Sequence, residues 1–268
     1  MKLIPLNVRD MRRNWEKMGK NDPFWAVLTE DAKKGSRWDA REFFSTGEKE
    51  IAGIMDYVQS LGLQVRREQA LDFGCGLGRL TQALGAHFPH VLGLDISSSM
   101  VEQARSLNAR GEVCEFRVNA DADLRQVSSN TIDFIYSSIT LQHIDPEYSR
   151  VYLAEFIRVL RPGGVLVFQL PDRRTNEAVV PAAGSAAAQP PSLKRFYWAA
   201  REALHNLRLR WIYRLRILRN APIIPMHGIA RAEVEKLLQD AGARLVDAQP
   251  DTSAGPQWVS YRYCVQKS

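Results

Sequence analysis

The chain has 268 residues and a mass of 30.4 kDa; 45% of the residues are hydrophobic and 25% are charged. These proportions exclude disordered, collagen-like and fibrous proteins, and the length suits one large domain with an insertion. The net charge of +6 permits an anionic partner but does not require one.

The composition also indicates a reduced compartment. Three scattered cysteines, Cys75, Cys114 and Cys264, are too few for a disulfide framework or a zinc site. The first residues lack the apolar segment of a signal peptide, and no run of the chain is apolar enough to cross a membrane. We therefore expect a cytoplasmic protein.

Residues 1–65 are expected to form a helical N-terminal cap with a helix over 48–61. Aromatic residues are concentrated there: Trp15, Phe24, Trp25, Trp38, Phe43 and Phe44. The simpler interpretation is that these side chains pack over a sheet. The alternative is that some of them form a lid over a small-molecule site at the sheet's carboxyl edge.

Residues 66–170 alternate short β-rich runs with helical patterns. The predicted strands are 69–73, 91–96, 113–119, 131–138 and 164–170, and the helices are 80–88, 97–107 and 146–160. Because the strands are almost continuously apolar, both faces of the sheet should be covered. The pattern predicts an α/β fold with a doubly wound, mostly parallel sheet.

Residues 171–225 look like an insertion in that core. An Ala/Pro-rich linker at 181–191 precedes a helical stretch at 193–219, which carries eight basic residues and one acidic residue, Glu202. The simplest interpretation is an amphipathic cap with solvated arginines. The alternatives, in order, are binding of an anionic small molecule or glycan, contact with a membrane surface, and RNA binding, for which no module is present.

Residues 226–268 return to the core. A helix at 231–241 and strands at 244–248 and 261–266 complete a seven-stranded sheet.

A glycine-rich turn follows the first predicted strand and opens a helix. Gly74, Gly76 and Gly78 allow a tight turn in which backbone N–H groups approach a ligand closely. The spacing disfavours a dinucleotide site, because Arg79 occupies the position of its last glycine. Asp72, just before the turn, suits a cationic ligand better than a pyrophosphate.

Polar residues also end the next two predicted strands. Asp95 lies 21 residues after Gly74, where an acidic side chain can accept both hydroxyls of a ribose. Asn119 and Asp121 end the third strand and can face an adenine amine. Each feature is weak alone, but their order and spacing reinforce one another.

With these residues the sequence resembles a class I S-adenosylmethionine (SAM)-dependent methyltransferase of the small-molecule type, over about 66–170 and the closing strands. Four stretches carry the resemblance: LDFGCGLGR (71–79), GLDIS (93–97), TIDFIYS (131–137) and RVLRPGG (158–164). It implies SAM as cofactor and a Rossmann-like sheet with a reversed final hairpin.

The resemblance also assigns roles to individual residues. The implied contacts are Gly74, Gly76 and Arg79 with the methionine moiety, Asp95 with the ribose, Ile96 and Asp121 with the adenine, and Ser137 with the methyl-donor pocket. The last of the four stretches has a structural explanation, since it ends a helix and turns into a strand.

Departures from subfamily patterns narrow the expected reaction. The motifs of adenine and glutamine N-methyltransferases, cytosine C5 enzymes and metal-dependent catechol-type enzymes are absent, and the five histidines form no metal-spaced cluster. We expect metal-independent methylation, at oxygen, of a small molecule or glycan. The aromatic N-terminal cap and the insertion at 171–225 are expected to close the acceptor pocket as a lid. The alternatives are N- or C-methylation of a natural-product or quinone-like substrate, and a SAM-binding regulatory or scaffold protein without activity.

A hydroxyl acceptor also needs a base. His143 directly follows the fourth strand on the cofactor edge, and Asp145 could orient it. The competing interpretation is that His143 packs against the cofactor or caps the following helix.

Overall fold

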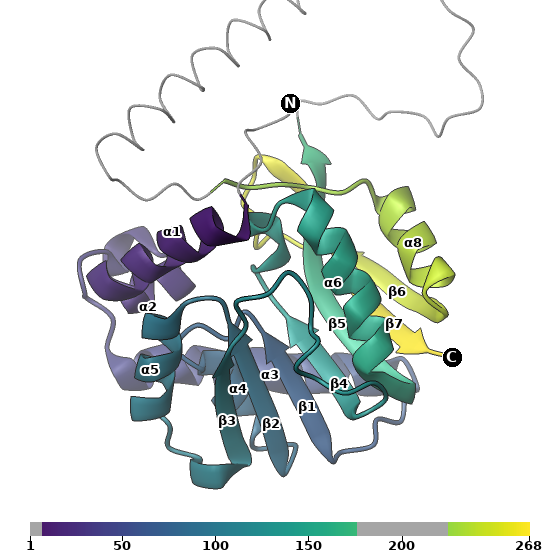
Figure 1. The fold of residues 1–268 in the computed structure, drawn as a ribbon, viewed down its shortest axis with the longest axis horizontal. Helices are drawn as coiled ribbons and strands as arrows, with labels where there is room; N and C mark the ends of the chain where they lie inside the picture. The colour runs from purple at the N-terminus through teal and green to yellow at the C-terminus, as the bar shows by residue number, and fades with distance from the viewer. Residues whose placement is uncertain (1–6, 176–224) are drawn as a thin grey trace, which may run out of the picture.

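A seven-stranded sheet organises the residues that the computed structural model describes, 7–175 and 225–268 (Figure 1). The strands are β1 (Gln69–Phe73), β2 (His90–Asp95), β3 (Cys114–Val118), β4 (Ile132–Ser137), β5 (Leu160–Arg174), β6 (Ala243–Pro250) and β7 (Trp258–Lys267). Their order is β3-β2-β1-β4-β5-β7-β6, with β7 antiparallel to both of its neighbours and the pairs among β1–β5 parallel. The predicted fold class is confirmed.

Helices cover both faces of this sheet. They are α1 (Val8–Asn21), α2 (Pro23–Val27), α3 (Ala40–Ser60), α4 (Arg79–Leu84), α5 (Ser98–Ser106), α6 (Pro146–Val159) and α8 (Arg231–Asp240), with 3-10 turns η1 (Asp31–Lys33), η2 (Gly111–Val113) and η3 (Leu141–His143). In the described ranges, no helix has the length and apolar character needed to cross a membrane.

Consecutive strand residues supply the two cores. Leu71 and Ile135 pack on the face covered by α6 and α8. Their neighbours Ala70 and Phe134 pack on the opposite face, against α3, α4 and α5. This explains why the strands are continuously apolar, because successive side chains point to opposite and equally buried faces.

Side-chain caps determine where four helices begin. In each case a side-chain oxygen accepts a backbone N–H of the first turn, and the capping residues are Asn7 for α1, Asp39 for α3, Ser97 for α5 and Asp145 for α6. The cap at Asp39 explains why α3 begins at Ala40, earlier than the predicted start at residue 48.

The strand β5 is longer than predicted. It continues past residue 170, and Pro171 and Arg174 pair with Ser260 and Trp258 of β7. Residues 171–174 therefore belong to the core rather than to the insertion. The predicted linker at 181–191 and the basic stretch at 193–219 lie outside the described residues.

The N-terminal helices form a third packed group, which we call the N-terminal aromatic cluster. Its buried members are Met18, Ala26, Trp38, Phe43, Leu77 and Met100, and Trp15, Phe24, Trp25, Val27, Leu28, Phe44 and Leu107 pack against them. Because Leu77 lies in the turn after β1 and Met100 lies in α5, the cluster attaches α1 and α2 to the carboxyl edge of the sheet.

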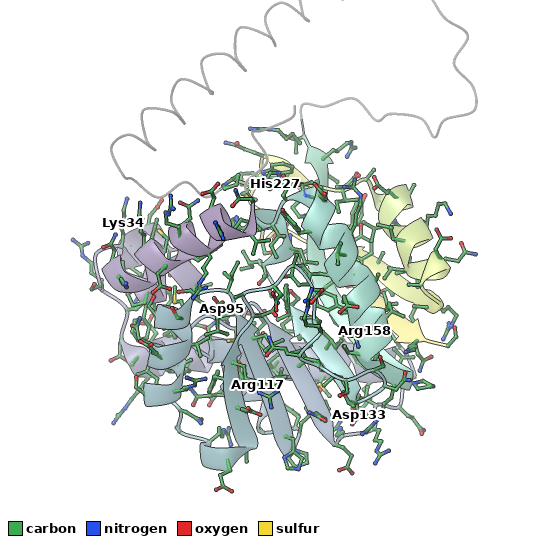
Figure 2. All side chains as sticks on the ribbon, viewed as in Figure 1. Lys34, Asp95, Arg117, Asp133, Arg158 and His227 are labelled. Atoms are coloured by element: carbon green, nitrogen blue, oxygen red, sulfur yellow. The ribbon has the colours of Figure 1, made fainter. Side chains whose placement is uncertain are left out.

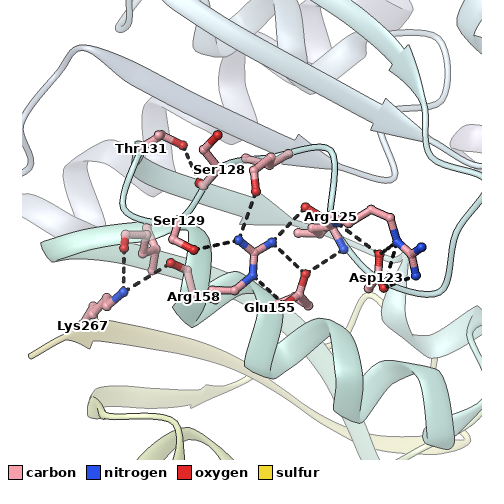
Figure 3. Close-up of polar contacts among 11 residues, drawn as sticks. Asp123, Arg125, Ser128, Ser129, Thr131, Glu155, Arg158 and Lys267 are labelled. Atoms are coloured by element: carbon pink, nitrogen blue, oxygen red, sulfur yellow. Dashed lines mark hydrogen bonds and ion pairs between the residues drawn. The ribbon is translucent and has the colours of Figure 1, made fainter.

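The loop between β3 and β4 is held by one arginine at the end of α6 (Figure 3). The guanidinium of Arg158 donates to both carboxylate oxygens of Glu155, at 2.7 and 2.8 Å. It also donates to the carbonyl oxygens of Leu124 and Val127 and to Oγ of Ser129, at 2.9 to 3.1 Å. Arg158 thus fixes a loop whose first residues lie at the carboxyl end of β3.

Replacing Arg158 should therefore destabilise the fold. Arg158→Ala is expected to lower the free energy of unfolding by about 1.5–3 kcal/mol, because it leaves a carboxylate and two loop carbonyls without their partner. Arg150→Ala is the matched control, since Arg150 forms an exposed ion pair with Glu233 and should cost about 0–1 kcal/mol. Urea denaturation followed by circular dichroism measures both, and equal losses would contradict the assigned role.

Candidate functional site

A cavity of about 550 Å³ opens at the carboxyl edge of the sheet, beneath α1 and α2. It lies where the strand order reverses between β1 and β4, the place at which open α/β sheets bind ligands. Its volume is in the range of small-molecule sites, about 300–1,000 Å³.

The cavity has two ends. The β2–β3 end is formed by the turn after β1 together with Asp95, Ile96 and Asn119. The β4–β7 end is formed by residues 138–140 and 142–144 after β4, by Trp15 and Met226, and by residues 253–255 between β6 and β7. Figure 2 shows Asp95 at the end of β2, below α1.

Two glycines of the turn after β1 are required by close neighbours. Gly74 and Gly76 have positive φ angles of 82° and 51°. A Cβ at Gly74 would overlap the side chain of Thr140, and one at Gly76 would overlap that of Val27 in α2. The turn therefore lies tightly against the loop after β4 and against the N-terminal helices.

Asp95 connects this turn to α5. One carboxylate oxygen accepts the N–H of Gly76 at 2.9 Å, and the other accepts the N–H of Ser97 at 2.8 Å. Burial raises the pKa of Asp95, and hydrogen bonds from the backbone of Ser97, Gly76 and Ile96 act in the opposite direction. Each oxygen keeps a second acceptor site, so the carboxylate can accept two ligand hydroxyls.

Arg79 lines the cavity, and residues of α3 hold its guanidinium in place. Its guanidinium donates to Glu50 at 2.8 Å and to Thr46 at 3.2 Å, both on α3, and the side chain is buried. Its Nε is buried and has no hydrogen-bond partner within the described residues. A donor of this kind suits a ligand carboxylate.

Three of the predicted site residues are placed away from the cavity wall. Asp72 is buried below the turn and accepts a 2.6 Å hydrogen bond from Thr81, and burial raises the pKa of Asp72 to about 7. Ser137 is also buried, and its hydroxyl donates to the carbonyl of Phe73 on the neighbouring strand.

Asp121 is exposed, and its backbone carbonyl rather than its carboxylate is engaged, by the hydroxyl of Tyr152. Two other residues line the cavity in their place. They are Ser138, which follows Ser137, and Asn119 at the end of β3. The structure thus brings Gly74, Gly76, Arg79, Asp95, Ile96, Asn119 and His143 together around the cavity and leaves Asp72, Asp121 and Ser137 outside its wall.

His143 lines the β4–β7 end in a defined tautomer. Its Nδ1 lies 3.1 Å from the carbonyl oxygen of Pro225. Because a carbonyl can only accept, Nδ1 carries the proton and Nε2 is left with a lone pair, which accepts from Nε2 of Gln142 at 3.1 Å. Burial lowers the pKa of His143 to about 4, so the ring is neutral at neutral pH. Asp145 does not orient His143; it caps α6.

A chain of buried amides supports this arrangement. Nε2 of Gln169 donates to Oε1 of Gln142 at 3.2 Å and to Oγ of Ser260 at 2.7 Å. The carbonyl of Gln142 accepts the N–H of His227 at 2.7 Å. Sequence reasoning missed Gln142 and Gln169 because the contacts join distant segments and leave no local pattern.

The helix α1 bridges the two ends of the cavity. The ring of Trp15 meets that of His143 edge to face, with centroids 5.6 Å apart. The adjacent Glu16 accepts hydrogen bonds from Oγ of Ser97 at 2.9 Å and from the N–H of Ser99 at 3.2 Å, at the start of α5. Of the six aromatic residues singled out in the sequence, Trp15 is the one that lines the cavity, and a lid role for it stays a prediction.

The loop after β4 contains an unusual backbone. Ile139, which lines the cavity, has a φ of 57°, a conformation that β-branched residues rarely adopt. No feature of the sequence indicated it. Among residues 7–175 and 225–268, no group of three or more His, Cys, Asp or Glu side chains could hold a metal ion.

Comparisons with known proteins agree with this fold. Residues 71–168 match the model of a family described as a methyltransferase domain. Carboxy-S-adenosyl-L-methionine synthase from Aeromonas salmonicida (strain A449) is 26% identical over 147 residues, which is 50% of this chain and 59% of that protein. The corresponding synthase from Chromohalobacter salexigens is 32% identical over 49% of this chain and 54% of that protein. The chain thus spans little more than half the length of these curated relatives.

Solved structures resemble the whole described fold. Magnesium protoporphyrin IX methyltransferase from Synechocystis PCC 6803, with bound SAH, has a TM-score of 0.59 and 16% identity, covering 98% of this chain and 100% of that chain. The same enzyme with bound SAM has a TM-score of 0.58. At this level of identity the likeness concerns the fold.

The contact between Glu16 and α5 should control how firmly α1 is held. Glu16→Ala is expected to speed amide exchange in α1 by about 5–30-fold, since it removes about 1–2 kcal/mol of capping interaction while alanine keeps the helix propensity high. Glu102→Ala, at an exposed position of α5, is the control and should leave α1 unchanged. Hydrogen–deuterium exchange measures this, and unaltered exchange in both variants would contradict the bridging role.

Proposed function

We propose that this chain, which belongs to the class I SAM-dependent methyltransferases, transfers the methyl group of SAM to a hydroxyl of a small molecule or glycan without a metal ion. The observation that carries the proposal is the pairing of Asp95 at one end of the cavity with a neutral histidine at the other.

The β2–β3 end fits the cofactor. Asp95 has acceptor capacity for the two ribose hydroxyls, Ile96 offers an apolar contact for the adenine, and the unpartnered Nε of Arg79 can donate to the carboxylate. When bound, SAM supplies a methyl group on a positively charged sulfur. The turn at Gly74 and Gly76 lines the cavity and would present its backbone to that ligand.

His143 is the proposed base. Its Nε2 carries the lone pair of the ring, which accepts from Gln142 and would exchange that hydrogen bond for one from the acceptor hydroxyl. The proton on Nδ1 is fixed by Pro225. Gln142 and Gln169 keep the ring in place, which limits the motion that would misalign acceptor and methyl group.

The alternatives remain N- or C-methylation of a natural-product or quinone-like substrate, and a SAM-binding regulatory or scaffold protein without activity. The name of the curated relatives adds modification of SAM itself as an outcome to be tested. A cytoplasmic location, and the roles of residues 193–219 in covering the site or in contacting an anion or a membrane, stay predictions.

Calorimetric titration tests the cofactor first. We expect micromolar binding of SAM and SAH and none of NAD. Mass spectrometry of reactions with sugars and phenols then separates the outcomes, because methyl transfer releases SAH with a methylated acceptor, whereas modification of SAM gives a heavier SAM derivative. Failure of a folded protein to bind SAM and SAH would overturn the proposal.

Asp95 should dominate binding at the β2–β3 end. Asp95→Ala is expected to weaken SAH binding by about 1–3 kcal/mol, because two ligand hydroxyls lose a charged acceptor. Asp121→Ala is the matched control, and its exposed side chain predicts unchanged affinity. If only the second variant loses affinity in calorimetry, the acidic contact to the cofactor lies in the loop after β3 instead.

The pH dependence should report the base. Since the pKa of His143 is lowered to about 4, its neutral form is present above that pH, and kcat/KM is expected to fall only as pH drops toward 4. His143→Gln should reduce kcat by about 100-fold or more while SAH affinity stays the same. An acidic limb near the ordinary histidine pKa, or equal losses of kcat and SAH affinity, would remove His143 from this role; circular dichroism checks folding at each pH.

A further inference from the structure

The two ends of the cavity differ in charge. Among the described side chains of its wall, Arg79 and Asp95 carry fixed charges, and both belong with the cofactor side. Burial keeps His143 at the β4–β7 end neutral. An acceptor held at the β4–β7 end by these residues therefore meets no charged group, and burying an unpaired charge there would be costly.

The walls of that end are apolar and include one large ring. Trp15 from α1, Ile139 and Ile144 from the loop after β4, and Met226 and Ala254 line it. Trp15 is fixed by its edge-to-face contact with His143 and by the binding of its neighbour Glu16 to α5. An indole beside isoleucine, methionine and alanine side chains favours a flat, apolar ligand.

The polar groups of the same end are already engaged. The hydroxyl of Thr140 donates to the carbonyl of Ser138 at 3.1 Å, and that of Ser253 donates to Asp251. The Gln142 amide is bound to Gln169 on one side and to His143 on the other. A sugar would bury several hydroxyls with few partners among these residues, at about 1–3 kcal/mol for each one left unpaired.

From this arrangement we propose that the β4–β7 end accepts an uncharged, flat, apolar molecule with a phenolic or enolic hydroxyl, stacked on Trp15. The proposal rests on the proposed function and narrows its acceptor class. An oxygen lone pair of the acceptor forms the new O–C bond as the C–S bond of SAM breaks and its electron pair stays on sulfur. Nε2 of His143 exchanges its hydrogen bond from Gln142 for one from the acceptor hydroxyl, takes the hydroxyl proton and then releases it to solvent.

The weak basicity of His143 agrees with an acidic hydroxyl. A histidine with a pKa of about 4 is poorly matched to an alcohol, with a pKa near that of water, about 15.7. A phenol, with a pKa of about 10 as in tyrosine, is much closer. Proton transfer in the transition state is easier when that gap is smaller.

The test uses the full chain loaded with SAH and three probes: 2-naphthol, methyl β-D-glucopyranoside and glucose 1-phosphate. We expect saturation-transfer NMR and calorimetry to detect binding of 2-naphthol and not of the two sugars. With SAM in place of SAH, mass spectrometry should detect 2-methoxynaphthalene. Binding or methylation of either sugar without 2-naphthol would overturn this proposal but not the proposed function, whereas failure to bind SAH would overturn the proposed function itself.

Variants at two tryptophans localise the effect. Trp15→Ala should weaken 2-naphthol binding by about tenfold, Trp15→Phe should retain most of it, and both should bind SAH as the unaltered chain does. Trp25→Ala is the matched control, because Trp25 belongs to the same N-terminal aromatic cluster but does not line the cavity. Equal weakening by Trp15→Ala and Trp25→Ala would mean that the cluster's stability, rather than the Trp15 ring, governs binding, and would overturn the stacking assignment.

Discussion

The carboxylate of Asp95 is the interaction on which the geometry of the cavity depends. Its two oxygens bind the N–H of Gly76 and the N–H of Ser97, so the turn after β1 and the start of α5 are fixed relative to each other. A carboxylate removed from water is tolerated only when such bonds compensate it. Because Glu16 binds the same end of α5, the position of α1, and with it the roof of the cavity, follows from this contact.

The opposite end is organised by neutral groups. The carbonyl of Pro225 fixes the proton of His143 on Nδ1, and the N–H of His227 binds the carbonyl of Gln142. Residues 225–227 are therefore anchored on the loop after β4, and the chain that returns to the core does so at the site itself. Burial keeps the ring of His143 neutral rather than cationic, with its proton on Nδ1. The charged side chains of the cavity wall, Arg79 and Asp95, thus lie at the β2–β3 end, and the described side chains of the β4–β7 end are uncharged.

The sequence predicts what depends on local pattern. The alternation of strands and helices, the glycine turn and Asp95 all follow from short-range signals, and each is where it was expected. The sequence does not distinguish Ser137 from Ser138, because one step along a strand reverses the face of the side chain, and here the buried hydroxyl binds Phe73. It also cannot show that Trp15 alone among six singled-out aromatic residues reaches the cavity, since that depends on the long-range contact of Glu16 with α5.

The strained backbone at Ile139 is a feature that long-range contacts determine. The φ of 57° at this β-branched residue costs free energy, and such strain persists only where surrounding contacts determine the conformation. Those contacts are visible on either side. Thr140 occupies the space that a Cβ at Gly74 would need, and Gln142 is held by Gln169 and His227. The absence of a side chain at Gly74 thus has a role within the chain itself, because it lets the loop after β4 approach the turn after β1. That approach directs His143 into the same cavity that Asp95 lines from the other end.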